Sequence, residues 1–467
     1  MRHLTTLCIN LFCLSFLSAG TVAIADEVKP QPMPTHLGFP TPGYVVLQWI
    51  QNNNLEAMRQ HSWDIWNTMA QPSGQYYGVK KTELPVWDTW KSTAEIWNTQ
   101  GKSQSRQLHA FQLARQQLGL HGQHSQTSND RSSGDFAVAL MKFDPVAATF
   151  IETPQQAADG KMYSIKTFTG LEKINAAWPE DTPIEQRAIR DFTRGAVETK
   201  PTFFPVKNGT LTPVPMWQGG LSATNHVNPT PATWKNCVLV DSNNAKTDIQ
   251  LLRKATTDEI TNAITVANFS CKHFFYAPIG LFYSVTLTTD NAQAFDTLQW
   301  TTVDKNLRLS AGDHAVLVAM HVNTKETDGW TWQTYYWQGG IEQDEYNPGS
   351  LRNQPADLPA PWKHYAMCTA YDEIIGGQPV VCFNPYLETH SGIPDGIHSN
   401  CVTCHRVAAI GPNKTTPAYP VSYNPVVYPI PVQMNNPELF KNRTKTDHSW
   451  AVVGIDPAKP VKAPKTE

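Results

Sequence analysis

Proline is the residue that most restricts how this chain of 467 residues folds. The sequence contains 35 prolines, and they are spread along its length rather than gathered in one segment. A proline inside a helix removes a backbone hydrogen bond and clashes with the preceding turn, whereas loops and edge strands tolerate it. We therefore expect short strands and many loops, and the pattern disfavours a helical bundle.

The expected fold class is α+β, divided into successive regions. After a signal peptide at 1–25, we predict a Pro-rich leader and helical N-terminal part over 26–134. A predominantly antiparallel, β-rich α+β middle region follows over 135–360. A loop-rich C-terminal region, which contains the cysteine motif described below, covers 361–454. The last residues, 455–467, read as a disordered tail.

The predicted helices of the N-terminal part rest on apolar spacing. Apolar residues repeat at near-helical intervals over 44–51 and 55–69, with Asn54 as a plausible N-cap of the second helix. A third helix is expected at 106–118, and further helical intervals near 184–198 and 254–267.

The predicted strands of the middle region are short and apolar. Residues 314–322 form a nearly continuous apolar run, as in a strand buried on both faces. After a polar turn, residues 330–337 are expected to form the neighbouring strand. Asn208-Gly209 predicts a β-hairpin turn. The stripe of Trp330, Trp332 and Trp337 would suit a glycan platform, although large aromatics more often pack a core.

The first residues have the features of a cleaved secretory signal. Arg2 and His3 precede a mostly apolar core over 4–18, and Ala23-Ile24-Ala25 offers small residues before the cleavage point. No later stretch approaches 18 consecutive apolar residues, so the mature chain is expected to have no transmembrane segment. The expected location is the periplasm.

Charge and motifs exclude several classes of function. The net charge of −3 gives no reason to expect a nucleic acid partner. The sequence has no nucleophile elbow, P-loop or dinucleotide fingerprint, so a hydrolase, an NTPase or a dehydrogenase finds no support.

The cysteines are consistent with an oxidising compartment. Of the 8 cysteines, two lie in the signal peptide and two in the motif described next, which leaves Cys237, Cys271, Cys368 and Cys382. We predict a Cys368–Cys382 disulfide, because Gly376-Gly377 midway between them could turn a hairpin, and a Cys237–Cys271 disulfide by elimination. Free buried cysteines are the alternative.

The motif is Cys401-Val402-Thr403-Cys404-His405, and it occurs once. Two thiols at this spacing, followed by a histidine, are the pattern of covalent c-type haem attachment. The thiols form thioethers with the haem vinyl groups, and the histidine becomes the proximal iron ligand. A compact zinc site that includes His398 is one alternative, and a redox or structural disulfide is another.

Together with Gly411-Pro412 downstream, this motif resembles the bacterial periplasmic c-type cytochromes. The resemblance implies one covalent haem c held by Cys401 and Cys404, with His405 on the iron. It also implies that the carbonyl of Pro412 accepts a hydrogen bond from the His405 ring, which fixes the ring and tunes the iron.

A looser resemblance extends upstream. The segments 362–368 and 382–388 look like those of bacterial cytochrome c family proteins that join a long N-terminal region to one haem motif. Only 62 residues follow His405, ten of them proline, so the attachment region is not expected to form a complete class I cytochrome c fold.

The distal iron ligand is the least determined part of the predicted site. Met434 is the only methionine after His405, and it is the residue we predict, with a solvent-facing loop methionine as the alternative. The remaining candidates are a downstream histidine and four upstream residues: His448, His364, Met367, His390 and His398.

The leading functional hypothesis is a periplasmic mono-haem cytochrome that exchanges single electrons with a redox partner protein, and so an electron carrier rather than a catalyst. The first alternative is a haem enzyme or a redox or gas sensor with an open distal site, for which His398 or His390 would supply acid–base chemistry. The second alternative is a module that binds a glycan or a protein and carries an accessory haem.

Overall fold

The computed structural model of the chain describes residues 28–35, 38–77, 82–97, 138–217, 230–289, 291–292, 305–339, 349–389, 396–417 and 433–453. The predicted signal peptide, the predicted helix at 106–118, the predicted tail and His390 lie outside these residues.

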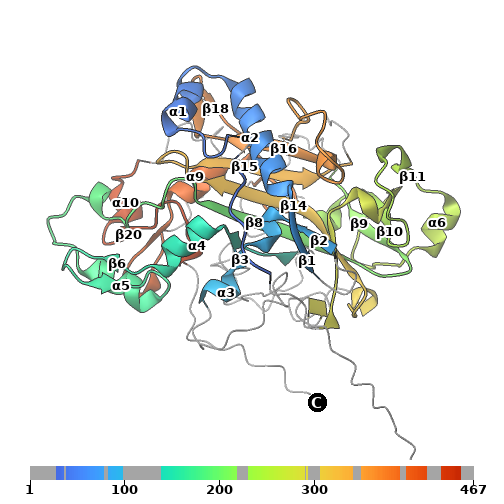
Figure 1. The fold of residues 1–467 in the computed structure, drawn as a ribbon, viewed down its shortest axis with the longest axis horizontal. Coiled ribbons are helices and arrows are strands. Elements are labelled where there is room, and N and C mark those ends of the chain that lie inside the picture. Colours follow the sequence, from blue (N-terminus) through green and yellow to red (C-terminus); the bar gives the residue numbers. More distant parts are fainter. Residues whose placement is uncertain are drawn as a thin grey trace, which may run out of the picture.

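An eight-stranded sheet forms the centre of the described fold (Figure 1). Its main path runs β16–β15–β14–β8–β5–β3, with β13 added to β14 and β4 added to β8, and all of these pairings are antiparallel. The strands are β3 (Lys91–Ser92), β4 (Val138–Ala139), β5 (Lys142–Phe143), β8 (Val197–Val206), β13 (Ser284–Thr286), β14 (His314–Thr324), β15 (Thr331–Trp337) and β16 (Tyr365–Ala370).

The two long strands predicted from the sequence lie side by side in this sheet. β14 pairs with β15 from Ala319↔Tyr336 to Thr324↔Thr331. All residues of β14 are buried except His321, as expected for a strand covered on both faces. The predicted helix at 184–198 is wrong: a short 3-10 turn at Ile184–Gln186 is followed by irregular chain and then by β8.

A second, four-stranded sheet has the order β11–β12–β10–β9, with β10 and β12 parallel. Its strands are β9 (Leu211–Pro215), β10 (Asn236–Asp241), β11 (Arg253–Lys254) and β12 (His273–Pro278). The chain turns at Asn208-Gly209, where Gly209 has a φ of 75°, but β8 and β9 are not paired across this turn. The predicted hairpin is therefore wrong, because β9 passes into the second sheet and pairs with β10.

Two-stranded sheets complete the described strands. They are β1 (Pro72–Tyr77) with β2 (Thr82–Pro85), β6 (Gln155–Gln156) with β7 (Met162–Tyr163), β17 (Ile374–Ile375) with β18 (Gln378–Pro379), and β19 (Ala409–Ile410) with β20 (Thr444–Lys445).

The helices are distributed along the described chain. They are α1 (Gly43–Gln51), α2 (Leu55–Ala70), α3 (Thr93–Trp97), α4 (Pro145–Glu152), α5 (Phe168–Ala176), α6 (Thr257–Asn262), α9 (Cys401–Arg406), α10 (Pro437–Phe440) and α11 (Trp450–Val453). The helices predicted at 44–51 and 55–69 are present, and the Asn54 side chain caps α2 by accepting the Ala57 N–H at 3.1 Å. None of the helices in the described ranges is long and apolar enough to cross a membrane.

The predicted fold class is wrong in assigning a helical N-terminal part. Within 26–134 the described residues form α1, α2 and α3, but also β1, β2 and β3, and β3 belongs to the central sheet. The chain leaves α2 at Pro72, which cannot continue a helix, and enters β1 at once. The result is a fold of mostly antiparallel sheets with short helices along its length.

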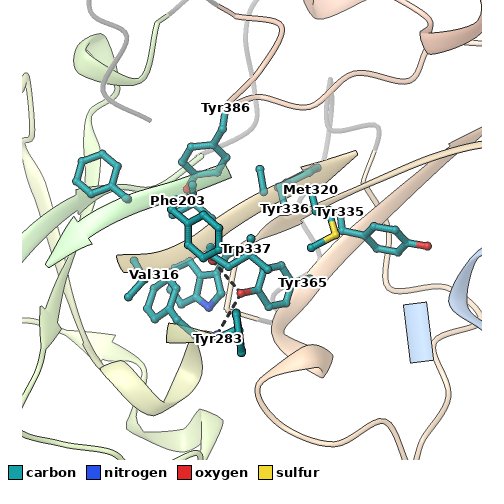
Figure 2. Packing of buried hydrophobic residues seen from close by; sticks show 14 of the residues in the cluster. Phe203, Tyr283, Val316, Met320, Tyr335, Tyr336, Trp337, Tyr365 and Tyr386 are labelled. Atoms are coloured by element: carbon teal, nitrogen blue, oxygen red, sulfur yellow. Dashed lines mark hydrogen bonds between the residues drawn. The ribbon is translucent and has the colours of Figure 1, made fainter. Parts of the chain in front are cut away.

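Two large apolar clusters and one small one lie in the described fold. One large cluster contains Trp66 of α2, which stacks on Tyr335 of β15 with ring centroids 4.1 Å apart. Within the same cluster the Tyr365 hydroxyl accepts the backbone N–H of Tyr283 and donates to the oxygen of Leu317 (Figure 2). The other large cluster contains α4, α9, α11 and Trp332. β15 thus contributes to both clusters: Trp332 to the second, and Tyr335, Tyr336 and Trp337 to the first.

The tryptophan stripe is buried rather than displayed. Trp330, Trp332 and Trp337 have exposed fractions of 1%, 3% and 0%. Trp330 and Trp332 belong to the cluster around α9, and Trp337 belongs to the cluster around α2. These three rings therefore fill the core and offer no surface to a glycan.

Both predicted disulfides are present. Cys237 and Cys271 are joined, with their Cα atoms 5.6 Å apart, and so are Cys368 and Cys382, at 5.7 Å. The first joins β10 to the segment before β12, and the second joins β16 to the segment leading to α9. Among the described cysteines, Cys401 and Cys404 are the two that lie outside a disulfide.

Candidate functional site

The Cys401–His405 motif forms most of helix α9, and Asn400 fixes where that helix begins. The Asn400 side-chain oxygen accepts the N–H groups of Val402 at 2.7 Å and Thr403 at 3.4 Å. Its amide donates to the backbone oxygens of Val380 at 2.7 Å and Asp372 at 3.2 Å. One buried asparagine therefore caps the motif helix and ties it to the chain around β17 and β18.

The two thiols lie beside the Cys368–Cys382 disulfide without taking part in it. The Cys401 sulfur is 3.7 Å from the backbone oxygen of Cys382, and both motif cysteines are half-buried. Burial raises the pKa of the Cys401 thiol well above its usual value, and the nearby Glu388 carboxylate raises it further. The closed disulfides leave this pair of thiols, two residues apart on one helix, available for thioether formation.

The His405 ring is fixed by one hydrogen bond and one ring contact. Its Nδ1 is 2.9 Å from the backbone oxygen of His448, which accepts and never donates, so Nδ1 carries the proton. The lone pair of the neutral ring is then on Nε2. The ring also packs on the indole of Trp332, with centroids 4.2 Å apart.

The electrostatic surroundings keep this ring neutral. Burial is the main cause that lowers the pKa of His405 to about 3, and the positive groups His321 and Lys200 lower it further. A metal-binding histidine must be neutral, and its second nitrogen normally donates to a carbonyl or carboxylate. His405 meets both requirements.

The acceptor of the His405 hydrogen bond differs from the one that the resemblance implied. Pro412 begins a short 3-10 turn after β19, and the oxygen on Nδ1 belongs to His448. Pairing of β19 with β20 brings the C-terminal segment back to α9, and the Trp450 indole donates to the Cys404 oxygen at 3.0 Å. No local sequence signal marks His448, because it lies 43 positions after His405 and reaches it through this pairing.

A polar row of the central sheet lies near the motif. Lys200 of β8 is opposite His321 of β14, which is opposite Thr334 of β15. Lys200 and His321 are the one half-exposed residue in each of two strands that are otherwise buried. Thr334 is two residues from Trp332 in β15, so this row lies on the face of the sheet that carries Trp332, on which the His405 ring packs.

The His321 imidazole is held in place on both sides. Its Nδ1 lies 2.8 Å from the Thr334 hydroxyl, and its Nε2 lies 2.7 Å from a carboxylate oxygen of Glu388. Burial alone would raise the pKa of Glu388, but the charge and the hydrogen bond of His321 hold it below its usual value. His321 interrupts the apolar run 314–322, and its partner at 388 is distant along the chain.

The other predicted ligands are distributed unevenly around the motif. Met434 is half-buried and packs against the same apolar cluster as Cys401 and Cys404. His398 lies in the 3-10 turn before Asn400, while His364 bonds to the Thr247 oxygen and Met367 packs in the α2 cluster. Of the two predicted methionine ligands, Met434 therefore shares an apolar cluster with the thiols and Met367 does not.

No protein-family model matches the chain. The searches of curated proteins and of solved structures likewise give no match. Within the described ranges, no group of three or more His, Cys, Asp or Glu side chains is arranged to hold a metal ion directly. What the site holds therefore has to be argued from its own geometry.

Proposed function

We propose that this chain is an exported protein that binds one haem c covalently, through Cys401 and Cys404, and exchanges single electrons with a redox partner. The observation that carries the proposal is the His405–His448 hydrogen bond, because it leaves the lone pair of a neutral imidazole on Nε2, on the same short helix as two cysteines that are not in a disulfide. The haem would supply an iron that cycles between the ferrous and ferric states.

The surrounding residues fit this assignment. Asn400 and Trp450 hold the motif helix, and Trp332 supports the His405 ring. Every described cysteine outside the motif is already in a disulfide, as an exported protein favours. Met434 is the distal ligand that we propose, because it packs in the same cluster as the thiols.

The first test is the absorption spectrum of the protein after denaturation in alkaline pyridine, from a host that attaches haem c. We expect the bands of haem with two thioether links. Cys401→Ser and Cys404→Ser should each shift the bands towards those of a single link, and the double variant should lose the covalent haem. His398→Ala, just before the motif, is the control and should leave the bands unchanged. If the protein carries no covalent haem but binds zinc, and the cysteine variants and His398→Ala each abolish the zinc binding, the zinc alternative replaces this proposal.

A haem enzyme with an open distal site is the second candidate function, and the Lys200–His321 row favours it. His321, braced by Glu388, is a titratable side chain that is half-exposed on the motif side of the sheet. Carbon monoxide separates the two functions. If Met434 occupies the distal position, carbon monoxide should not change the absorption spectrum of the reduced protein. If the distal position is open, the gas should shift that spectrum strongly. Met434→Ala should convert the first behaviour into the second.

A further inference from the structure

The segment that carries the His448 carbonyl is fixed on both sides by buried polar side chains of the central sheet. Before His448, the Asp447 carboxylate accepts hydrogen bonds from the Lys325 ammonium at 2.6 Å and from the backbone N–H of Phe192 at 2.8 Å. After His448, the Ser449 hydroxyl donates to Glu198 at 2.8 Å. The His448 oxygen therefore has little freedom to move relative to the sheet.

The backbone of this segment depends on those contacts. Asp447 and His448 have φ values of 50° and 67°, in the left-handed region that costs free energy for residues other than glycine. The Thr446 hydroxyl donates to the Ser449 oxygen at 2.8 Å, which closes the turn. Two successive residues in this conformation persist because their neighbours are bonded so tightly.

Glu198 is connected to His405 by a second route across the sheet. Its other oxygen accepts the Asn323 amide at 3.1 Å, and Asn323 lies opposite Trp332 in the sheet register. Trp332 is the residue on which the His405 ring packs. Glu198 is thus bonded to the segment that carries the His448 carbonyl, through Ser449, and to Asn323, the residue of β14 that is opposite Trp332 in the register.

We propose that Glu198 is a positioning residue for His405, and that its carboxyl takes up a proton when the bound iron gains an electron and releases it when the iron is oxidised. This inference rests on the proposed haem. Reduction adds one electron from the redox partner, and one proton from solvent neutralises the Glu198 carboxylate. Oxidation reverses both steps, because the added positive charge on the iron favours the ionised carboxyl.

The electrostatics of the buried carboxyl support this assignment. Burial is the main cause that raises the pKa of Glu198 to about 7, the hydrogen bonds from Ser449 and Asn323 oppose it, and the charges of Asp447 and Asp144 add to it. The other titratable groups around this region are Lys325, which is paired with Asp447, and His448. A carboxyl that is half-ionised near neutral pH is the one whose proton a nearby change of charge displaces.

The test is a redox titration of the holoprotein between about pH 5 and pH 9. The midpoint potential of the native protein should fall as pH rises through the region around neutrality. The limiting slope is about 59 mV per tenfold change in proton concentration, the one-electron value. Glu198→Gln, which keeps the shape but does not ionise, should remove the slope. Asp144→Asn is the matched control, because Asp144 has a similarly raised pKa but caps α4 and does not bond to the 447–449 segment. Its slope should remain, with the midpoint moved to lower pH, because the charge of Asp144 raises the pKa of Glu198.

A second variant keeps the carboxyl and removes only its link to the ligand segment. Because the Ser449 hydrogen bond lowers the pKa of Glu198, Ser449→Ala should move the midpoint of the slope to higher pH. In protein that carries covalent haem, three results would overturn the inference. The midpoint potential of the native protein could be independent of pH, its slope with pH could be equal in the native protein and Glu198→Gln, or the midpoint of the slope could stay unmoved in Ser449→Ala. Absence of covalent haem would instead overturn the proposed function, and this inference with it.

Discussion

The Nδ1 atom of His405 lies 2.9 Å from the backbone oxygen of His448, although 43 positions separate the two residues. This contact joins the helix that carries the motif to the last described segment of the chain. It determines which ring nitrogen carries the proton, and therefore which one is free for a metal. The predictions below follow from the groups that hold this contact and the helix beneath it.

The cap of α9 should contribute more to stability than an exposed cap elsewhere. Asn400→Ala removes the buried cap and also leaves the oxygen of Val380 without this donor. We expect a loss of about 1–3 kcal/mol in the free energy of unfolding, measured by urea denaturation. Asn54→Ala, which removes an exposed cap of α2, should cost about 1 kcal/mol or less. Equal losses would contradict this account of Asn400.

The two disulfides should be separable in their effect on the motif. Replacing Cys368 and Cys382 together by alanine should destabilise the protein by about 3 kcal/mol, and the same change at Cys237 and Cys271 by about 4, because the second loop is longer. Only the first pair lies against Cys401, so only its removal should alter the haem absorption of the folded protein. Identical spectral changes in both double variants would disprove this.

The Arg406 side chain should hold α9 through a partly buried ion pair. Its guanidinium donates to Glu373 at 2.7 Å and to Asp372 at 3.1 Å, and Glu373 is buried. Arg406→Met should cost about 2 kcal/mol of unfolding free energy, because it leaves the Glu373 carboxylate without this donor. Adding Glu373→Gln should recover part of the loss. Arg194→Met, which breaks an exposed pair with Asp328, should cost under about 1 kcal/mol. If Glu373→Gln recovers nothing, the pair is not the cause.

The buried carboxyl of Glu198 should make stability fall as pH rises from about 4.5 to about 7. Over this interval the unfolded chain has released the proton while the folded protein still holds it, so the folded state binds more protons. Over the whole interval the free energy of unfolding should fall by about 3 kcal/mol from this carboxyl. Urea unfolding at both ends should show that Glu198→Gln has a smaller loss with pH than the native protein. If the free energy of unfolding falls more steeply with pH in Glu198→Gln than in the native protein, this explanation is contradicted.

Local patterns in the sequence predicted the elements whose contacts are local. The continuous apolar run at 314–322 and its partner at 330–337 are adjacent strands, and Asn54 caps the helix that follows it. The even number of cysteines, together with Gly376-Gly377, predicted the Cys368–Cys382 pairing, because that loop is short. In each case the physical cause lies within a few residues of the pattern.

The parts that the sequence did not predict depend on contacts between distant residues. Asn208-Gly209 has the composition of a hairpin turn, but pairing with β10 draws β9 into another sheet. The acceptor at His448 and the carboxyl of Glu198 reach the motif only after β19 pairs with β20 and β8 pairs with β14. Neither residue has a neighbour in the sequence that marks its role.

The most direct test of the central claim is the mass of the peptide that contains Cys401 and Cys404, isolated from protein made with haem c attachment. The account predicts this peptide with the added mass of one haem, while Cys237–Cys271 and Cys368–Cys382 are recovered as disulfide-linked peptides. An exported protein in which Cys401 and Cys404 are recovered unmodified, or joined to each other, would contradict it.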